Sequence, residues 1–320
     1  MNPEPFGGFE LNLKGRHLIT MQEFSKEEVY LILDQASEFK RRRYLGENFT
    51  DVLHNKPVAM IFEKPSTRTR VSTEVAITEL GGKALYLSAN EVQLSRGETI
   101  EDTARVLTRY VYGIVARLGS HDNIVKLAEN SRVPIINALT PMYHPMQILA
   151  DLMTIREKKR KLEGLKLSFV GDGNNICHSL LIGCSQVGMN ISVGTPKGYQ
   201  PDEEIVRAAE QYARTSGSSV SVSNDPIEAV RDADVIYTDV FVSMGQEAES
   251  AERLKAFPPF QVNKRLTLNA NESYIFLHCL PAHRGQEVAA EVIDDPIHSV
   301  VWDEAENRLH IAKSILALLV

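Results

Sequence analysis

The chain alternates short apolar runs, rich in β-branched residues, with longer segments whose apolar residues recur at helical spacing. The short runs are typical of buried strands and the longer segments of amphipathic helices. The pattern predicts strands at 57–62, 83–87, 113–117, 133–136, 166–171, 190–194, 219–222, 234–238 and 274–277. It predicts helices at 26–43, 68–80, 101–110, 122–130, 145–161, 176–187, 202–215, 226–231 and 303–318.

This alternation falls into two series that meet near residues 150–165. Strands that alternate with helices form parallel sheets with helices on both faces. We therefore expect an α/β protein with two doubly wound parallel-sheet domains, residues 1–150 and 151–302, joined by interdomain helices. Ligands of such sheets bind outside the carboxyl ends of the strands, so the region between the domains is the expected site.

Two helix starts carry specific signals. Ser25 and Glu28 have the spacing of a capping box, in which each side chain bonds the backbone N–H of the other residue. Asp225 precedes Pro226, which predicts a cap followed by proline at the first helical position.

Composition and charge narrow the classes of function. The net charge of -7 argues against a general nucleic-acid binder, and no basic run is longer than Lys40 to Arg43. No apolar run approaches the length that spans a bilayer, and the first residues lack a secretory signal pattern. The three cysteines have no metal-type spacing and cannot all pair with one another. We therefore expect a cytoplasmic protein without nucleic-acid or membrane partners.

The most informative stretch is the predicted strand 57–62 and the run Ser66 to Arg70 (Ser-Thr-Arg-Thr-Arg) that follows it. The run places hydroxyl groups, fixed positive charge and unpaired N–H groups at one helix N-terminus, which favours a phosphate. Any one of these residues alone is typical of a helix cap or a surface ion pair. Arg68 and Arg70 do not share a helix face, so we expect one to meet the anion and the other to be structural.

Other polar side chains follow predicted strands. Arg117 ends one strand, and His144 and Gln147 open the long helix after another. Asp239 and Cys279 each follow a strand of the second series. Taken singly, each has a plain alternative: an edge salt bridge for the arginine, a structural hydrogen bond for the histidine, and a buried inert thiol for the cysteine.

The segment Gly171 to Ile176 (Gly-Asp-Gly-Asn-Asn-Ile) follows the first strand of the second series. It superficially matches a dinucleotide-binding loop, but Ile176 stands where that motif needs its third glycine. No acidic residue closes a second strand where a ribose would sit. We therefore interpret Asn174 and Asn175 as neutral hydrogen-bonding groups or helix caps, and a nicotinamide-dependent dehydrogenase is disfavoured.

Five motifs in this order resemble those of the aspartate/ornithine carbamoyltransferase family. They are Ser66 to Arg70, His144 to Gln147 (His-Pro-Met-Gln), Asn174 and Asn175 after Gly171, Asp239 with Ser243 to Gly245 (Ser-Met-Gly), and His278 to Pro281 (His-Cys-Leu-Pro). The likeness runs from about residue 15 to the end, and the Ser-Met-Gly sequence indicates the ornithine branch. The aspartate and putrescine branches fit less well in this loop.

The resemblance implies transfer of the carbamoyl group of carbamoyl phosphate to the δ-amine of L-ornithine, which gives L-citrulline and phosphate in arginine biosynthesis. It implies no metal or organic cofactor, because the substrate is already activated. It also implies a homotrimer, with the last helix, about 303–320, packed on the first domain. A carbamoyltransferase for another amine such as putrescine, and a non-catalytic anion-binding regulatory protein, stay open as alternatives.

The resemblance also implies site residues. Those implied for carbamoyl phosphate are Ser66, Thr67, Arg68, Thr69, Gln93, Arg117, His144, Gln147, Cys279, Leu280 and Arg308, with Gln93 lent to a neighbouring subunit. Those implied for ornithine are Asn175, Asp239, Ser243 and Met244. The implied catalytic residues are Arg117, His144 and Cys279, and Cys279 is the expected proton acceptor.

Overall fold

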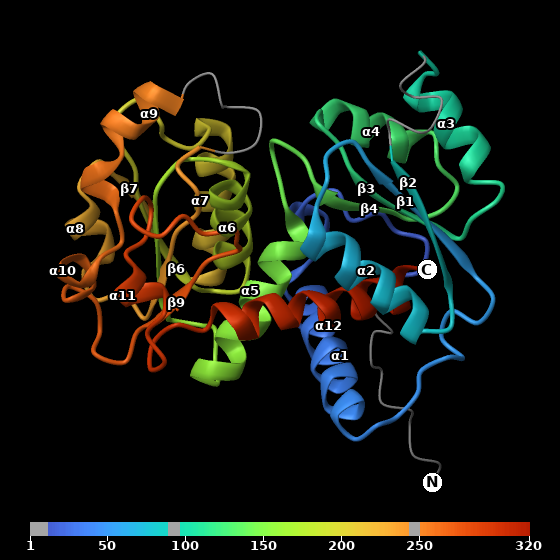
Figure 1. Cartoon of the computed structure of the whole chain (residues 1–320), viewed down its shortest axis with the longest axis horizontal. Coiled ribbons are helices and arrows are strands. Elements are labelled where there is room, and N and C mark those ends of the chain that lie inside the picture. Colours follow the sequence, from blue (N-terminus) through green and yellow to red (C-terminus); the bar gives the residue numbers. More distant parts are fainter. Residues whose placement is uncertain (1–11, 89–96, 243–249) are drawn as a thin grey trace, which may run out of the picture.

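The structure is a computed structural model that describes residues 12–88, 97–242 and 250–320. It contains two sheets in which all described pairings are parallel, with strand orders β2-β1-β3-β4 and β7-β6-β5-β8-β9. Each sheet belongs to one lobe of the molecule (Figure 1). The predicted α/β fold with two doubly wound parallel-sheet domains is therefore confirmed.

The first sheet consists of β1 (Pro57–Phe62), β2 (Lys83–Ser88), β3 (Gly113–Arg117) and β4 (Ile135–Leu139). Its helices are α2 (Thr67–Glu79), α3 (Ile100–Leu107) and α4 (His121–Glu129). Alternate residues of β1 enter two different cores. Met60 packs in the core that includes α2, α1 (Lys26–Tyr44) and α12 (Val301–Leu319), and Ile61 packs in the core that includes α3 and α4. Both faces of the sheet are therefore buried, which explains the continuous apolar run.

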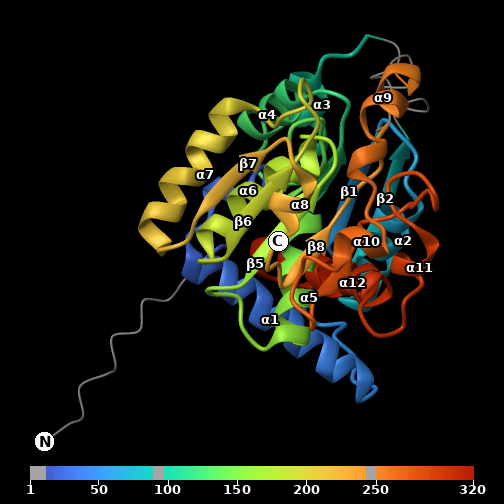
Figure 2. The same cartoon turned by 90° about the vertical axis from the view of Figure 1, so that its left-hand side faces the viewer.

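The second sheet consists of β5 (Lys166–Val170), β6 (Asn190–Gly194), β7 (Val220–Ser223), β8 (Val235–Tyr237) and β9 (Ile275–Leu277). Its helices are α6 (Asn175–Gln186), α7 (Glu203–Ser216), α8 (Pro226–Val230), α9 (Ser250–Ala256), α10 (Lys264–Thr267) and α11 (Ala290–Ile293). Helices α6 and α7 pack together along this sheet (Figure 2). Short 3-10 helices lie at Met21–Glu23 and Pro258–Phe260.

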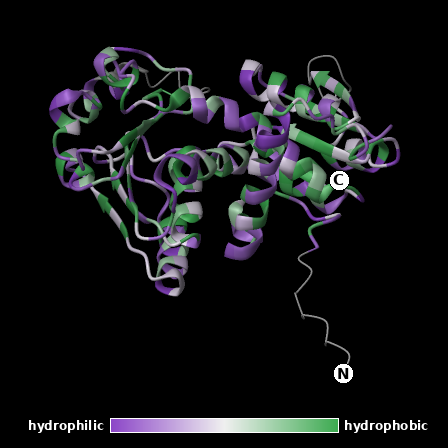
Figure 3. Ribbon diagram, turned by 90° about the horizontal axis from the view of Figure 1, so that it is seen from below, coloured by the Kyte–Doolittle hydropathy of each residue, from purple (hydrophilic) through white to green (hydrophobic). Residues whose placement is uncertain are grey.

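Two long helices connect the two lobes, and a third packs against them. Helix α5 (Pro145–Lys159) leaves the first sheet, and α12 (Val301–Leu319) packs against α1 (Lys26–Tyr44), α2 and α5. Figure 1 shows α12 crossing α5 and running into the first lobe. The last helix therefore places its side chains beside those of α2 and α5. Figure 3 shows hydrophobic residues along strands of the sheets and polar residues on outward-facing helical turns.

Most predicted elements are confirmed, and three strands match at both ends: 57–62, 113–117 and 190–194. Strand β4 begins at Ile135 rather than at 133, because the side chain of Ser131 bonds both the N–H and the carbonyl of Val133 and holds a turn there. Helices α9, α10 and α11 were not predicted, since segments of 7, 4 and 4 residues are too short to show a helical period.

Both cap predictions are confirmed. Ser25 and Glu28 form the complete capping box of α1, and the side chain of Asp225 accepts from the first N–H groups of α8.

Candidate active site

The N-terminus of α2 is the helix end at which the sequence predicts a bound phosphate. Ser66 occupies the cap position, but its side chain makes no cap hydrogen bond with the helix. Its hydroxyl is therefore not committed to capping. The helix has 13 residues and no acidic side chain in its first turn, so its positive end is not neutralised locally. This end is suited to an anion.

Three arginines from distant parts of the chain converge near this helix end. Arg68 Nη2 donates to the carbonyl oxygen of Leu280 over 2.5 Å. Arg308 Nη2 donates to Thr69 Oγ1 over 3.0 Å, and its Nη1 donates to Gln147 Oε1. Burial, together with the charges of Arg308 and Arg68, lowers the pKa of Arg117 to about 10. At neutral pH Arg117 therefore keeps its charge.

Two of these arginines have a buried N–H donor without a hydrogen-bond partner in the described residues. Arg117 is only 6% exposed, and its Nε has no hydrogen-bond partner within the described parts of the chain. Arg308 Nε is in the same situation. Unpaired buried donors and crowded positive charge are costly in an unliganded protein, so the cluster favours binding of an anionic oxygen-rich group.

His144 lies at the start of α5, next to Pro145 at the first helical position. Its backbone N–H donates to Ser179 Oγ over 2.8 Å, and its Nδ1 has no partner among the residues that the structure describes. Burial, followed by the charges of Arg308, Arg117 and Arg68, holds the pKa of His144 well below its usual value. The imidazole is therefore neutral at physiological pH and can donate one hydrogen bond to an oxygen atom.

Arg70 is the structural arginine of the run. It pairs with Glu74 one turn later, and its guanidinium lies over the ring of Tyr86 at 3.6 Å. Arg70 therefore has structural partners, whereas the charge of Arg68 acts on Arg117 in the arginine cluster. That Arg68 is the arginine that meets the anion stays a prediction.

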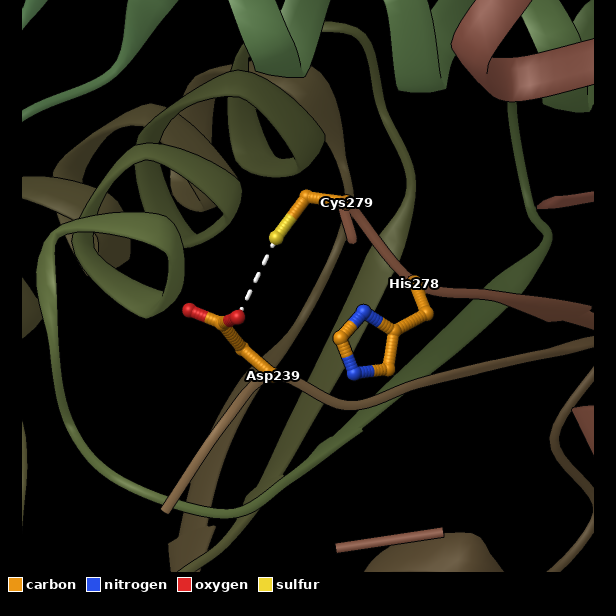
Figure 4. Close-up of side chains that lie close together, drawn as sticks. All are labelled: Asp239, His278 and Cys279. Atoms are coloured by element: carbon orange, nitrogen blue, oxygen red, sulfur yellow. Dashed lines mark hydrogen bonds between the residues drawn. The ribbon is translucent and has the colours of Figure 1, made fainter. Parts of the chain in front are cut away.

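A second group of polar side chains comes from the other lobe. Asp239 is nearly buried, and its carboxylate accepts from Asn174 Nδ2 over 2.8 Å and from Cys279 Sγ over 3.1 Å (Figure 4). Asn174 also caps α6, as expected. Asn175 Nδ2 donates to the carbonyl oxygen of Thr140 in the first lobe over 2.8 Å. The Asp239 carboxylate is thus held at the end of β8 as an acceptor for cationic groups.

Cys279 is a neutral thiol in this arrangement. Burial, and then the charges of Asp239 and Glu304, hold its pKa well above the usual value. The thiol keeps its proton and donates a hydrogen bond to Asp239. A proton-accepting role for Cys279 therefore requires that its own proton first pass to Asp239.

The side chains of Asp239, His278 and Cys279 place candidate metal ligands within 4.8 Å of one another. Both ring nitrogens of His278 are already engaged: Nδ1 accepts from the N–H of Leu280 over 2.9 Å, and Nε2 lies 3.2 Å from Glu287 Oε1. The cluster is therefore better suited to shaping the loop than to holding a metal.

Leu280 adopts a left-handed backbone conformation, with φ of 58°. A residue with a branched side chain rarely adopts this conformation unless its surroundings hold it there. Here the backbone N–H bonds His278 and the carbonyl accepts from Arg68. The strained turn thus joins the second lobe to the arginine cluster.

Sequence reasoning missed some contacts of this region. Arg253 on α9 forms a buried ion pair with Asp172 over 2.9 Å and lies over the ring of Tyr199. No local pattern pointed to it, because its partners are distant in the sequence. Of the expected site residues, Gln93, Ser243 and Met244 lie outside the described residues.

Two family models match the chain. The carbamoyl-P binding domain of aspartate/ornithine carbamoyltransferases matches residues 16–157, and the Asp/Orn binding domain matches residues 163–319. The chain belongs to the aspartate/ornithine carbamoyltransferase family.

Within the aspartate/ornithine carbamoyltransferase family, the chain is similar to proteins of the ornithine branch. It is 56% identical over 309 residues to the ornithine carbamoyltransferase of Pyrococcus horikoshii, with 97% of both chains covered. The solved ornithine carbamoyltransferase from Pyrococcus furiosus is 55% identical and has a TM-score of 0.93, over 97% of this chain and 98% of that one. The enzyme from Gloeobacter violaceus is 42% identical with a TM-score of 0.86, over 96% and 99%.

Proposed function

We propose that this protein is an enzyme that transfers the carbamoyl group of carbamoyl phosphate to the δ-amine of L-ornithine, which gives L-citrulline and phosphate. The observation that carries the proposal is the convergence of Arg68, Arg117 and Arg308 at the N-terminus of α2. Full-length similarity to ornithine carbamoyltransferases supports the choice of substrates.

The first lobe binds the activated donor. Ser66, Thr67, Arg68 and the free N–H groups of α2 hold the phosphate oxygens, to which helix end and guanidinium are both complementary. Thr69, Arg117 and neutral His144 surround the carbamoyl oxygen. Gln147, the Leu280 carbonyl and Arg308 complete this part of the site, together with Gln93 from a neighbouring subunit.

The second lobe binds the acceptor. Asp239 supplies a carboxylate for the α-ammonium group of ornithine, and Asn175 supplies a neutral amide beside it. Ser243 and Met244 follow Asp239 closely in the sequence and belong to the same part of the site. Cys279, which donates to Asp239, fixes this carboxylate in position.

In the reaction, the neutral δ-amine attacks the carbamoyl carbon, a new C–N bond forms, and negative charge develops on the carbamoyl oxygen. Thr69, Arg117 and His144 stabilise that charge. The C–O bond to phosphate then breaks, and the phosphate leaves with its electron pair. The amine loses one proton, which the Asp239–Cys279 pair can take up once the thiol proton has moved to the carboxylate.

A substrate panel tests the proposal. Carbamoyl phosphate is supplied with ornithine, putrescine, aspartate or acetylornithine, and the carbamoylated product and phosphate are measured. We expect turnover with ornithine to exceed turnover with each of the others. Preference for putrescine would move the protein to another branch of the family, and no product with any amine would indicate a non-catalytic anion-binding protein.

We further propose a cytoplasmic homotrimer, in which residues 1–150 with the last helix bind carbamoyl phosphate and residues 151–302 bind ornithine. Exposed apolar side chains of the first lobe, Val71, Tyr110 and Tyr112, support association through that lobe. In the described residues, no helix has the length and apolar character needed to cross a membrane. Light scattering tests the assembly: a trimer has three times the chain mass of 35.8 kDa.

A further inference from the structure

Asp151 and Glu304 are two buried carboxyl groups behind the arginine cluster, where α5 and α12 cross (Figure 1). Their exposed fractions are 0% and 1%. Gln147 lies one helical turn before Asp151, and its Nε2 donates to Asp151 Oδ1 over 2.8 Å and to Glu304 Oε1 over 3.0 Å. One amide nitrogen therefore bridges both carboxyl groups.

The donors around these carboxyl groups do not satisfy all their oxygens. Glu304 Oε1 also accepts from Tyr237 OH over 3.2 Å, and Glu304 Oε2 accepts from the backbone N–H of His278 over 2.8 Å. Asp151 Oδ2, in contrast, meets no donor in the described chain. Arg308 directs its Nη groups to Gln147 and Thr69 rather than to these carboxyl groups. Within the described ranges, neither Asp151 nor Glu304 forms an ion pair.

Two buried carboxyl groups without a counter-ion cannot both be ionised at low cost. Burial raises the pKa of Asp151, and it holds the pKa of Glu304 well above the usual value. Because Gln147 Nε2 lies within hydrogen-bond distance of one oxygen of each group, the two carboxyl groups are close neighbours, and their mutual repulsion is relieved when one of them carries a proton. A proton held between the two groups would also give Asp151 Oδ2 a partner.

We propose that Asp151 and Glu304 share one proton and together act as positioning residues that orient the carboxamide of Gln147. The pair holds the amide nitrogen of Gln147, so its oxygen is turned toward Arg308 and the donor site. That oxygen has a second lone pair, which accepts from the NH₂ of the carbamoyl group. This contact rests on the proposed function. It explains why a carbamoyl group is recognised in preference to an acetyl group, because the NH₂ of a carbamoyl group donates a hydrogen bond and the methyl of an acetyl group does not.

Two isosteric substitutions separate this role from simple packing. In Asp151→Asn, the new amide oxygen accepts from Gln147 and the new amide nitrogen donates to Glu304, in place of the shared proton. In Glu304→Gln, one of the two oxygens of Glu304 is replaced by an NH₂ group, which is itself a donor. In one orientation this NH₂ group faces the N–H of His278, and in the other it faces the donors of Gln147 and Tyr237, so a donor meets a donor in both. If the two residues only pack, Asp151→Asn and Glu304→Gln should change KM for carbamoyl phosphate equally. If they share a proton, Glu304→Gln should change it more.

The titratable and charged groups that face the pair are Arg308 on α12, Tyr237 on β8, Cys184 on α6 and Cys279 after β9. Burial raises the pKa of both thiols and of the Tyr237 hydroxyl, so these three stay neutral near pH 7. The shared proton is therefore the one expected to titrate here as the pH rises.

Steady-state kinetics and infrared spectroscopy test the proposal. We expect Glu304→Gln to raise KM for carbamoyl phosphate about tenfold and KM for ornithine less than about twofold, and Asp151→Asn to raise KM for carbamoyl phosphate by at most about threefold. Infrared spectra at pH 7 should show a protonated-carboxyl C=O band in the unaltered protein that Asp151→Asn removes.

Equal KM effects of the two substitutions, or no such band in the unaltered protein, would overturn the shared proton. The infrared measurement needs no turnover and no Glu304 variant, so it decides the question even where Glu304→Gln fails to fold. Absence of citrulline formation by the unaltered protein would instead overturn the proposed function. The infrared band would still show whether Asp151 and Glu304 share a proton.

Discussion

Arg308 Nη2 donates to Thr69 Oγ1 over 3.0 Å, although the two residues lie 239 positions apart in the sequence. Thr69 is in the first turn of α2, directly after the buried strand β1, and Arg308 is in the middle of α12. The same guanidinium donates to Gln147 on α5. One side chain of the last helix therefore ties together the two helices that carry the donor site.

Replacement of Arg308 by lysine should separate charge from geometry. Arg308→Lys keeps the positive charge but cannot donate to Thr69 and Gln147 in the same planar geometry. We expect kcat/KM for carbamoyl phosphate to fall at least about tenfold, as loss of a charge-assisted hydrogen bond implies. Arg41→Lys is the matched control, because Arg41 is an exposed arginine of α1 paired with Glu38. Similar kinetics in both variants would contradict the role of Arg308.

Arg117 should matter for turnover more than for folding. Its buried guanidinium stays charged at neutral pH and has a spare donor for a developing oxyanion. We expect Arg117→Ala to lower kcat at least about a hundredfold. Circular dichroism and thermal unfolding monitor the fold. Near-normal turnover in a folded Arg117→Ala protein would remove this residue from the site.

Asp239 should discriminate between the two substrates. Its carboxylate belongs to the second lobe and is positioned by Asn174 and Cys279. Because an ammonium–carboxylate contact involves charged groups, we expect Asp239→Ala to raise KM for ornithine at least about tenfold. KM for carbamoyl phosphate should change much less. If both constants rise to the same extent, the assignment of Asp239 to the acceptor is wrong.

His310 should make stability depend on pH. It is fully buried on α12, where burial lowers its pKa to about 4, with Lys313 and Lys40 acting in the same direction. Between about pH 6.5 and the folded pKa, the unfolded chain binds more protons at this histidine than the folded chain does. The free energy of unfolding therefore falls as pH falls through this window, by up to about 3 kcal/mol from this group.

Urea unfolding at several pH values between 7.5 and 4 measures this loss. The matched variant is His310→Gln, whose amide can keep the bond that His310 Nε2 makes with Glu306 but does not titrate. We expect the decrease in unfolding free energy on acidification to be smaller in His310→Gln than in the unaltered protein. Parallel pH profiles for the two proteins would show that His310 does not contribute to it.

The sequence was informative wherever a feature depends on neighbours along the chain. The capping box of Ser25 and Glu28 joins residues three apart, and the apolar run 57–62 reports burial of both faces of a strand. The asparagines after Gly171 were correctly interpreted as neutral groups, since Asn174 caps α6. Local hydrogen bonding and hydrophobic periodicity depend on residues that are close together in the sequence, so they can be recognised before the fold is known.

Other features were settled only by how distant elements pack. The donation from Arg308 to Thr69, the contact of Arg68 with Leu280, and the crowding of Asp151 against Glu304 each join separate elements. Nothing within a few positions of Asp151 reveals that a second carboxyl group lies opposite it. Hydrogen-bond geometry and desolvation depend on distance in space. The sequence therefore determined which residue types were available, and the crossing of α5 and α12 decided which of them meet.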